Sequence, residues 1–456
     1  MALGGSFVTA TQAASFAGTF DGSSLRGGRL AEHQQSALAW ACDRPMALLA
    51  DPPGSGKTAV ACALIAHAFD VDGAVRGIWV TEAHLIPQTL RELRRFLPGL
   101  PSAAWTRRRG EPLTVVSYEM LTRRTQDLVE FDAQVIVLDE ASALKNHGPR
   151  ADAAKLVIAR AWQRFALTAT PMEVDAMETY RLLRMLGANK LPSEWQFEQF
   201  CLWQHYPSGD RKVVGVRPET LPELRAALAP YVLRREIDDL GLALPDVLEE
   251  QVWVTLTPPQ HEAYLAAARG PNDLERARRR DRACMSAAGR SAKAEAALAW
   301  LDADKARGKV VMFADQLHHL DIVQRLLDDA GIGWVRIDGS YGRSARTDAV
   351  TAFRDDPRIR VLLGTRVLER GIDGLQHAEV LVSLGSSFNP AREAQRLGRL
   401  RRPGAAHPVV RHVTFLTDTQ HEHEKWATVQ RRAQDSDAVI GQSAQPSTSP
   451  SRRDGA

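Results

Sequence analysis

Short apolar runs that end in a small or acidic residue recur along this chain, and a stretch with helical spacing of apolar residues follows most of them. This alternation predicts an α/β fold with a parallel sheet whose active loops follow the strand ends. A first series of such runs lies at residues 46–51, 77–83, 114–118, 135–140 and 165–170. A second series lies at residues 309–315, 334–339, 361–365, 380–385 and 410–416. Two separate series predict two α/β lobes in tandem.

The chain outside these two series has a different pattern. Between about 172 and 300, apolar residues recur at helical spacing, with one strand-like run at 249–257, so a mostly helical connection is expected. The last residues are rich in serine and proline and bury too little apolar surface to become ordered. The predicted parts are an N-terminal extension (1–23), a first lobe (24–236), a helical connection (237–290), a second lobe (291–420) and a polar, disordered tail (421–456).

Composition excludes several classes of protein. Hydrophobic residues make up 44% and charged residues 25%, which is typical of a soluble globular chain and not of a membrane, collagenous or disordered one. The net charge is only +3, so any affinity for nucleic acid must come from local patches. The four cysteines are far apart and predict neither a zinc module nor disulfides. Without a leader or membrane-spanning run, these features indicate a cytoplasmic protein, and the alanine- and arginine-rich usage favours a bacterial or phage source.

Residues 51–58 read D-P-P-G-S-G-K-T, follow the first apolar run and open a helical stretch. Gly54 and Gly56 let backbone amides turn inward around phosphate oxygens, and the helix N-terminus adds its positive end. In such a loop Lys57 reaches the β- and γ-phosphates and the Thr58 hydroxyl holds Mg²⁺. Asp51 stands where the full pattern has glycine, so only the shorter G-x-G-K-T form is present. The alternative is a glycine-rich turn at a helix start.

Two further patterns fit a nucleotide site. The run at 135–140 ends in Asp139 and Glu140, which after a phosphate loop are expected to hold Mg²⁺ and to orient or deprotonate the attacking water, respectively. Taken alone, this pair is an ordinary solvated strand end. Arg399 and Arg402 are three residues apart on a predicted helix, so they can share a face that points at a nucleotide. A basic surface helix is the alternative there.

These residues, in this order, resemble the superfamily 2 helicases and translocases, and more narrowly the SNF2 (Swi2/Snf2-like) ATPases, over roughly residues 28–420. The segments that carry the wider resemblance are L-A-E-H-Q-Q (30–35), the phosphate loop, V-V-S-Y-E-M-L (115–121), V-I-V-L-D-E-A-S (135–142) and A-L-T-A-T-P (166–171). The narrower one rests on L-K-N (144–146), Y-V-L-R-R (231–235), L-T-P-P-Q-H-E-A-Y (256–264) and F-N-P (388–390).

The resemblance implies two RecA-like lobes that form an ATP- and Mg²⁺-dependent motor moving along double-stranded DNA without strong sequence preference. By position, Gln34 is expected to read adenine, and Ser55 belongs to the phosphate loop. Arg399 and Arg402 would stabilise transition-state charge as arginine fingers. The residues expected to couple nucleotide state to DNA contact are Thr168, Thr170, Arg366, Gly371 and Gln395. No membrane partner is expected, whereas a protein partner that targets the motor fits its small size.

Departures from the family pattern keep other readings open. Ser142 stands where this group mostly has histidine, residues 364–376 drift toward the R-G-I-D form of strand-separating helicases, and R-P-G at 402–404 is similar to XPB-like helicases. A strand-separating DNA or RNA helicase is therefore the alternative, followed by a binding scaffold without ATPase activity. The arginines at 107–109 and at 276–282 fit either a solvated surface or a DNA contact.

Overall fold

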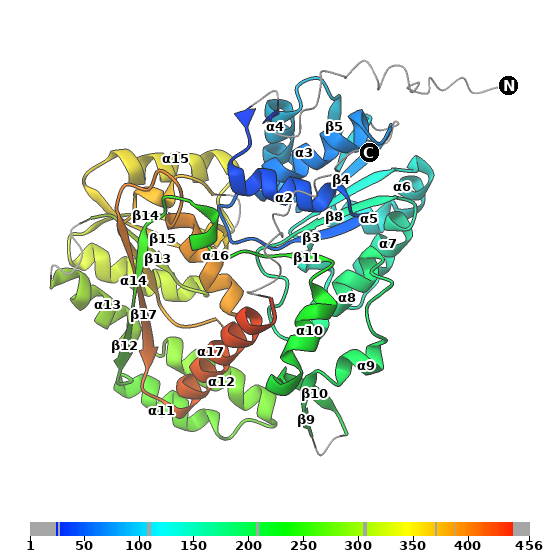
Figure 1. Ribbon diagram of the computed structural model, residues 1–456. Helices are drawn as coiled ribbons and strands as arrows, with labels where there is room; N and C mark the ends of the chain where they lie inside the picture. The colour runs from blue at the N-terminus through cyan, green and yellow to red at the C-terminus, as the bar shows by residue number, and fades with distance from the viewer. Residues whose placement is uncertain are drawn as a thin grey trace. The chain divides into compact units, whose positions relative to one another are not determined.

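The computed structural model describes residues 24–25, 28–106, 111–206, 209–303, 308–369, 372–387 and 389–440. The chain forms two compact units. The first unit comprises Met1–Gly241 together with Gln434–Ala456, and the second comprises Leu242–Ala433. Each unit is an α/β body with its own sheet (Figure 1).

The first unit is built on a seven-stranded sheet in the order β11-β3-β8-β7-β4-β6-β5, and every neighbouring pair is parallel. Its central strands are apolar on both faces, as expected for a parallel sheet covered by helices on both sides. The strands are β3 (Met46–Leu49), β4 (Gly77–Thr81), β5 (Ser102–Ala104), β6 (Leu113–Ser117), β7 (Val135–Asp139), β8 (Gln163–Leu167) and β11 (Val232–Leu233).

Helices cover both faces of this sheet, and each face has its own apolar core. The core on one face contains Leu38, Leu64 and Leu93, and the core on the other contains Leu121, Val157 and Leu183. The helices of the first face are α2 (Glu32–Cys42), α3 (Lys57–Asp70) and α4 (Ile86–Phe96). Those of the second are α5 (Tyr118–Arg123), α6 (Thr125–Phe131), α7 (Pro149–Ile158), α8 (Ala176–Leu186), α9 (Glu194–Glu198) and α10 (Leu221–Leu228).

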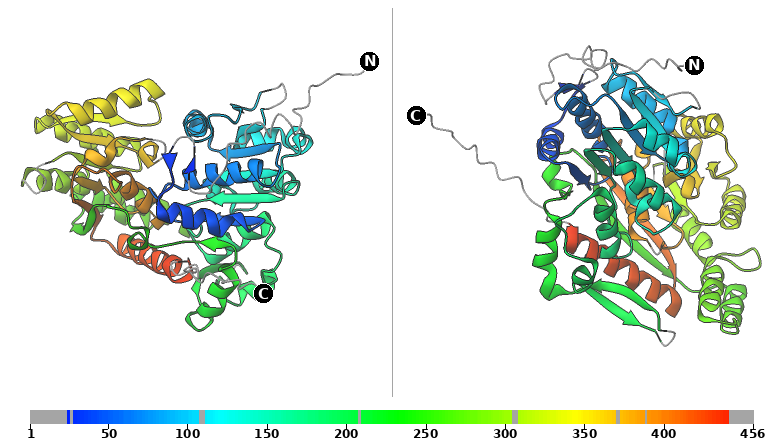
Figure 2. Two further views of the ribbon diagram at one scale, coloured as in Figure 1. Left: turned by 45° about the horizontal axis from the view of Figure 1, so that its top comes forward. Right: turned by 90° about the vertical axis from the view of Figure 1, so that its right-hand side faces the viewer.

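Two small antiparallel hairpins accompany this unit. One joins β1 (Ser24–Leu25) to β2 (Gly28–Arg29), and the other joins β9 (Cys201–His205) to β10 (Arg211–Val216). The β9–β10 hairpin projects beyond α9 (Figure 1), and the same green hairpin can be followed in the other views (Figure 2). Sequence spacing predicted mostly helix for this part of the chain, so the hairpin corrects that expectation. The hairpin was not predicted because a half-buried strand is recognised by alternating apolar and polar residues. Exposed apolar residues such as Leu202 and Tyr206 obscure that alternation here.

The second unit is built on a six-stranded sheet in the order β12-β17-β16-β13-β15-β14, again parallel throughout. The strands are β12 (Asp246–Val254), β13 (Val310–Phe313), β14 (Gly333–Ile337), β15 (Ile359–Gly364), β16 (Val380–Ser383) and β17 (Val409–Thr417). β12 pairs with β17 over the whole length of both strands, and it comes from the stretch that was expected to connect the lobes. The predicted connection at 237–290 is therefore not a separate helical part, because its strand completes this sheet.

Helices cover the second sheet as well, over two apolar cores that contain Leu320 and Leu327 on one face and Phe353 and Leu400 on the other. The helices are α11 (Pro258–Ala267), α12 (Asp273–Met285), α13 (Ala292–Asp302), α14 (Leu317–Asp329), α15 (Arg343–Asp355), α16 (Pro390–Leu400) and α17 (Gln420–Ile440). Within the described residues, no helix is both long and apolar enough to cross a membrane.

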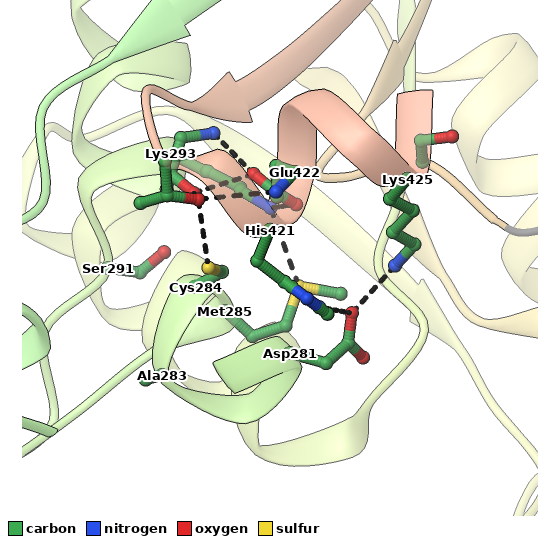
Figure 3. A network of polar contacts seen from close by, with 12 residues as sticks. Asp281, Ala283, Cys284, Met285, Ser291, Lys293, His421, Glu422 and Lys425 are labelled. Atoms are coloured by element: carbon green, nitrogen blue, oxygen red, sulfur yellow. Dashed lines mark hydrogen bonds and ion pairs between the residues drawn. The ribbon is translucent and has the colours of Figure 1, made fainter. Parts of the chain in front are cut away.

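Helix α17 is held by a buried polar network in the second unit (Figure 3). Glu422 forms an ion pair with Lys293 of α13, and both side chains are almost completely buried. Glu422 Oε2 also accepts a hydrogen bond from Thr417 Oγ1 at 2.7 Å. Lys425 Nζ lies 2.7 Å from Asp281 Oδ1 on α12. Burial alone would raise the pKa of Asp281, but His421 and Lys425 hold it well below its usual range.

The last residues of α17 belong to the first unit. Val439 and Ile440 are fully buried in one of its apolar cores, and the Arg225 guanidinium donates to the Ala438 carbonyl at 2.5 Å. The predicted disordered tail is therefore wrong for residues 421–440, which are helical. The remainder of that tail and the predicted extension at 1–23 lie outside the described residues. The predicted fold class is confirmed, and each of the ten predicted apolar runs overlaps a strand of one of the two sheets.

Candidate nucleotide-binding site

Three predicted site segments meet at one edge of the first sheet because of strand order and register. β8 lies between β3 and β7, and Leu167 is paired with Leu49 on one side and with Asp139 on the other. The strands are parallel, so the segments that follow them leave the sheet at the same edge. The phosphate loop, the acidic pair and the threonines at 168 and 170 therefore follow neighbouring strands at this edge.

The phosphate loop after β3 has the backbone shape that its glycines permit. Gly54 and Gly56 have φ angles of 85° and 79°, in the left-handed region where a side chain is strained. A Cβ atom at Gly56 would also collide with the amide of Gln34. Ser55 is buried, and its hydroxyl has no hydrogen-bond partner among the described residues. The Ser55 hydroxyl, next to the N-terminus of α3, is therefore available to donate a hydrogen bond to a bound acceptor such as a phosphate oxygen.

Lys57, the first residue of α3, folds back over the loop. Its Nζ donates to the Asp51 carbonyl at 2.7 Å and to the Pro52 carbonyl at 3.0 Å. Burial lowers the pKa of Lys57, although the nearby carboxylates of Glu140, Asp51 and Asp139 act in the opposite direction. The oxygens that accept hydrogen bonds from the Lys57 ammonium group are therefore uncharged main-chain carbonyls. Thr58 follows it in the first turn of α3.

Gln34 contacts the loop itself. Its Oε1 accepts from the Ala31 backbone nitrogen at 3.0 Å, and its Nε2 donates to the Ser55 carbonyl at 3.1 Å. The neighbouring His33 places its Nε2 2.9 Å from the same carbonyl oxygen. Helix α2 therefore supports the loop from outside, and the reading of adenine by Gln34 stays a prediction.

The acidic pair ends β7. Asp139 Oδ2 accepts a hydrogen bond from Thr81 Oγ1 at 3.4 Å, and the Asp139 carbonyl accepts one from Tyr118 Oη at 2.8 Å. Burial, followed by repulsion from Glu140, raises the pKa of Asp139 from 3.8 to about 7. Glu140 has a φ angle of 54°, a left-handed conformation that is uncommon for a residue with a side chain. Both features are typical of functional sites.

Thr168 and Thr170 form a short buried segment after β8. The Thr168 hydroxyl accepts from the Thr170 backbone nitrogen at 3.0 Å, and the two hydroxyl oxygens are 3.4 Å apart. Thr170 Oγ1 also lies 3.4 Å from Glu173, which is ion-paired with Lys145. Lys145 belongs to the L-K-N segment, so that segment is linked to the threonines through Glu173.

The predicted residues of the second lobe lie in the second unit, on or near α16. Arg402 Nη1 and Arg399 Nη1 lie 2.6 and 3.9 Å from the same Asp373 carboxylate oxygen. Helix α16 ends at Leu400, so Arg402 lies beyond it and the prediction that the two arginines share a helix face is wrong, although both side chains reach Asp373. Gln395 is half-buried on α16, and Arg366 is exposed after β15. Gly371 lies outside the described residues.

Several residues with structural importance at the site were not predicted. Asp51 is held by Arg235, and Tyr118 supports the main chain at Asp139. In the second unit, Arg396 is buried and lies 2.7 Å from Asp315. Arg235 belongs to a segment that carried the family resemblance, and Arg396 lies on the predicted helix of Arg399, so their places beside these residues were the available signal.

The basic stretch of α12 is exposed but largely neutralised within the helix. Arg279 and Arg282 lie 2.9 and 3.4 Å from Glu275, and Arg276 is paired with Asp273. The structure thus favours a solvated helix face there. The arginines at 107–109 lie outside the described residues. The part of the chain that the structure describes contains no group of three or more histidine, cysteine, aspartate or glutamate side chains that could hold a metal ion.

Two family models match the chain. A model of the SNF2-related domain matches residues 33–298, and a model of the helicase conserved C-terminal domain matches residues 292–404. The chain is similar to the human "SWI/SNF-related matrix-associated actin-dependent regulator of chromatin subfamily A member 1", with 25% identity over 87% of this chain and 42% of the relative. It is also similar to the mouse "Chromodomain-helicase-DNA-binding protein 1-like", with 24% identity over 83% of this chain and 47% of the relative.

An Arabidopsis thaliana protein named "Probable ATP-dependent DNA helicase CHR12" is 23% identical over 83% of this chain and 39% of its own length. The chain therefore spans less than half the length of the curated relatives it matches. Among solved structures, "Sulfolobus solfataricus SWI2/SNF2 ATPase core in complex with dsDNA" aligns with 92% of this chain and 99% of its own, at 20% identity and a TM-score of 0.45.

Proposed function

Since the chain belongs to the SNF2-related family, we propose that it is a nucleic-acid-stimulated ATPase of the SNF2 type that hydrolyses ATP to move along double-stranded DNA. The observation that carries the proposal is the shared sheet edge, where the phosphate loop, Lys57 and the acidic pair lie together. A glycine-rich turn without function would not need a carboxylate pair beside it.

The residues at this edge fit a nucleotide phosphate with Mg²⁺. The partnerless Ser55 hydroxyl, the left-handed glycines and the neutral partners of Lys57 suit an anion. Burial and repulsion from Glu140 raise the pKa of Asp139, and a bound cation would offset both effects. Thr58 and Asp139 are the residues that would hold Mg²⁺, which supplies positive charge to the phosphate oxygens when bound.

The other proposed roles in ATP hydrolysis belong to side chains of the protein. Lys57 would contact the β- and γ-phosphates, and Glu140 would orient or deprotonate the attacking water. Thr168 and Thr170 would respond to the occupancy of the site, and their position directly after β8, the strand between β3 and β7, supports this role. Arg399 and Arg402 would stabilise charge on the transferred phosphoryl group. For the last two, release from Asp373 is part of the proposal.

Duplex DNA is proposed as the track because the names of the relatives refer to chromatin and DNA. Scattered basic groups and backbone amides would hold its phosphates without strong sequence preference. Coupling would involve Arg366, Gly371 and Gln395. A targeting protein partner and a reducing, cytoplasmic setting remain part of the proposal. The named relatives come from animals and plants, so they lend no support to a bacterial or phage source.

A strand-separating helicase is the second candidate, favoured by the R-G-I-D sequence at 370–373 and by R-P-G at 402–404. The experiment that separates the two is the steady-state ATPase rate of the purified chain alone and with duplex DNA, single-stranded DNA or RNA. Stimulation by duplex DNA without strand displacement supports the translocase. Stimulation only by single strands supports the helicase instead, and absence of Lys57-dependent turnover would leave a binding scaffold.

Glu140→Gln gives a second test of the assignment. This variant should bind ATP with Mg²⁺ but hydrolyse it at least about 10²-fold more slowly, because the group that activates water is lost. Equilibrium binding and single-turnover hydrolysis measure the two steps separately. Hydrolysis at the parental rate would show that Glu140 does not have the proposed role.

A further inference from the structure

Strand register brings Asp51 and Arg235 together although they are 184 residues apart. β11 pairs in parallel with β3, with Leu233 opposite Leu49. Arg235 and Asp51 each follow two residues later, so they leave the sheet side by side at the edge that holds the phosphate loop. Asp51 is the residue that departs from the glycine of the full phosphate-loop pattern.

The contact between these two residues uses most of their polar atoms. Asp51 Oδ1 accepts hydrogen bonds from the Arg235 backbone nitrogen at 3.0 Å and from its Nε at 3.3 Å, and Asp51 Oδ2 accepts one from Nη2. The side chains are only 5% and 11% exposed. A buried pair with several charge-assisted hydrogen bonds has a fixed geometry. The main-chain carbonyl of Asp51 meanwhile accepts from Lys57, so one residue contacts both cations.

A second path runs from Arg235 back to the loop. Arg235 Nη1 donates to the His33 carbonyl at 2.6 Å. The His33 ring nitrogen Nε2 and the Gln34 amide nitrogen then lie 2.9 and 3.1 Å from the Ser55 carbonyl. One guanidinium therefore fixes the loop directly at Asp51 and indirectly at Ser55.

We infer that Arg235 is a positioning residue that sets the affinity of the phosphate loop for nucleotide, acting through Asp51, and that the chain segment leaving the first unit thereby regulates the site. Arg235 lies shortly before Gly241, where the main segment of the first unit ends. A displacement of this exit segment moves Arg235, and Arg235 moves the loop. This inference rests on the proposed ATPase function, because it concerns the same site.

The test is a double-mutant cycle on nucleotide affinity, using the full chain, a fluorescent ATP analogue and Mg²⁺. Arg235→Ala and Asp51→Ala should each weaken binding roughly tenfold, the size expected for losing charge-assisted hydrogen bonds. The double variant should bind about as weakly as either single variant, because the residues act as one unit. Arg235→Lys keeps the charge without the fork geometry and should lie between the parental chain and Arg235→Ala. ATPase measurements should show a larger rise in KM than fall in kcat.

Arg164→Ala is the matched control. Arg164 is also an arginine of the first sheet, but it donates to the Ala161 and Leu186 carbonyls, away from the loop. Its loss should lower the melting temperature and leave nucleotide affinity within about twofold of the parental value. If Arg235→Lys and Arg235→Ala bind the analogue as tightly as the parental chain, the inference is wrong while the ATPase proposal stands. If the parental chain shows no Lys57-dependent binding, both are wrong.

Discussion

Lys57 in the first unit and Lys293 in the second are lysines whose ammonium groups have different partners. Lys57 is half-buried, and its ammonium group donates to two main-chain carbonyl oxygens. Lys293 is fully buried, and its ammonium group is ion-paired with the equally buried Glu422 (Figure 3). Among the described contacts, Lys57 has no ion pair. The charge of Lys293 is neutralised inside the fold, whereas that of Lys57 is available to an incoming anion.

This difference separates a structural cation from a functional one on physical grounds. A buried charge is tolerated when a partner and hydrogen bonds compensate it, and such a pair fixes one arrangement of the chain. A charge with only neutral partners costs stability and lowers its own pKa, as burial does for Lys57. The half-buried charge of Lys57 is therefore expected to lower the free energy of unfolding, whereas the Lys293–Glu422 pair beneath α17 compensates its own charges.

Replacing Lys57 should have the largest effect on function, and it tests most directly whether Lys57 and Lys293 have different roles. Lys57→Ala should lower ATP hydrolysis by at least about 10²–10³-fold, because the phosphates lose a charged donor. Its melting temperature should stay equal to that of the parental chain or rise. Steady-state ATPase assays and thermal unfolding without nucleotide measure the two effects. A large loss of stability would mean that Lys57 is structural like Lys293.

Removing Lys293 should have the opposite profile. Lys293→Ala should lower the free energy of unfolding of the second unit by about 3–5 kcal/mol, because Glu422 is left buried without its partner. Urea titration followed by circular dichroism gives this value. The double variant Lys293→Met, Glu422→Leu should recover much of the loss, since an apolar pair removes both charges. If the double variant is less stable than Lys293→Ala, compensation by Glu422 is not the reason why Lys293 is tolerated.

The pH dependence of Asp139 extends the comparison to carboxylates. Asp139 releases its proton near pH 7 in the folded chain but near 3.8 when unfolded, so the folded chain binds more protons between these values and loses stability as pH rises. Asp139→Asn removes this cost. The variant should be more stable than the parental chain above pH 7, by roughly 1–4 kcal/mol, and the gain should vanish toward pH 4. Thermal unfolding from pH 4 to 8 tests this, with exposed Asp127→Asn as the control. A gain that is constant over this range would contradict the assignment.

Backbone strain at Glu140 gives the smallest expected effect. Glu140→Gly should stabilise the nucleotide-free chain by about 1 kcal/mol, because glycine adopts the left-handed conformation without penalty. Ala288 has a φ angle of 48° in the second unit, so Ala288→Gly should give a similar gain without affecting hydrolysis. Chemical denaturation measures both. Equal stability of Glu140→Gly and the parental chain would mean that local contacts already remove the strain.

Sequence reasoning predicted the two sheets because each apolar run is long enough to be recognised alone. It missed β11, which has two residues and is a strand only because β3 pairs with it. The contacts of Asp51 could not be predicted either, since Arg235 is adjacent through strand register and not through sequence. Val429, Val439 and Ile440 of α17 are buried, yet the serine- and proline-rich residues beyond them led to the wrong prediction of a disordered tail.

The burial of Val439 and Ile440 in the first unit has a consequence for biosynthesis. A ribosome makes the chain from residue 1 onward, and domains generally fold in the order of their appearance. The second unit can become complete as soon as residue 433 has emerged, but the first unit then still lacks its final segment. The part of the protein that is encoded first is therefore finished last. Until then the contacts that Arg225 and Arg234 make with this segment are missing as well.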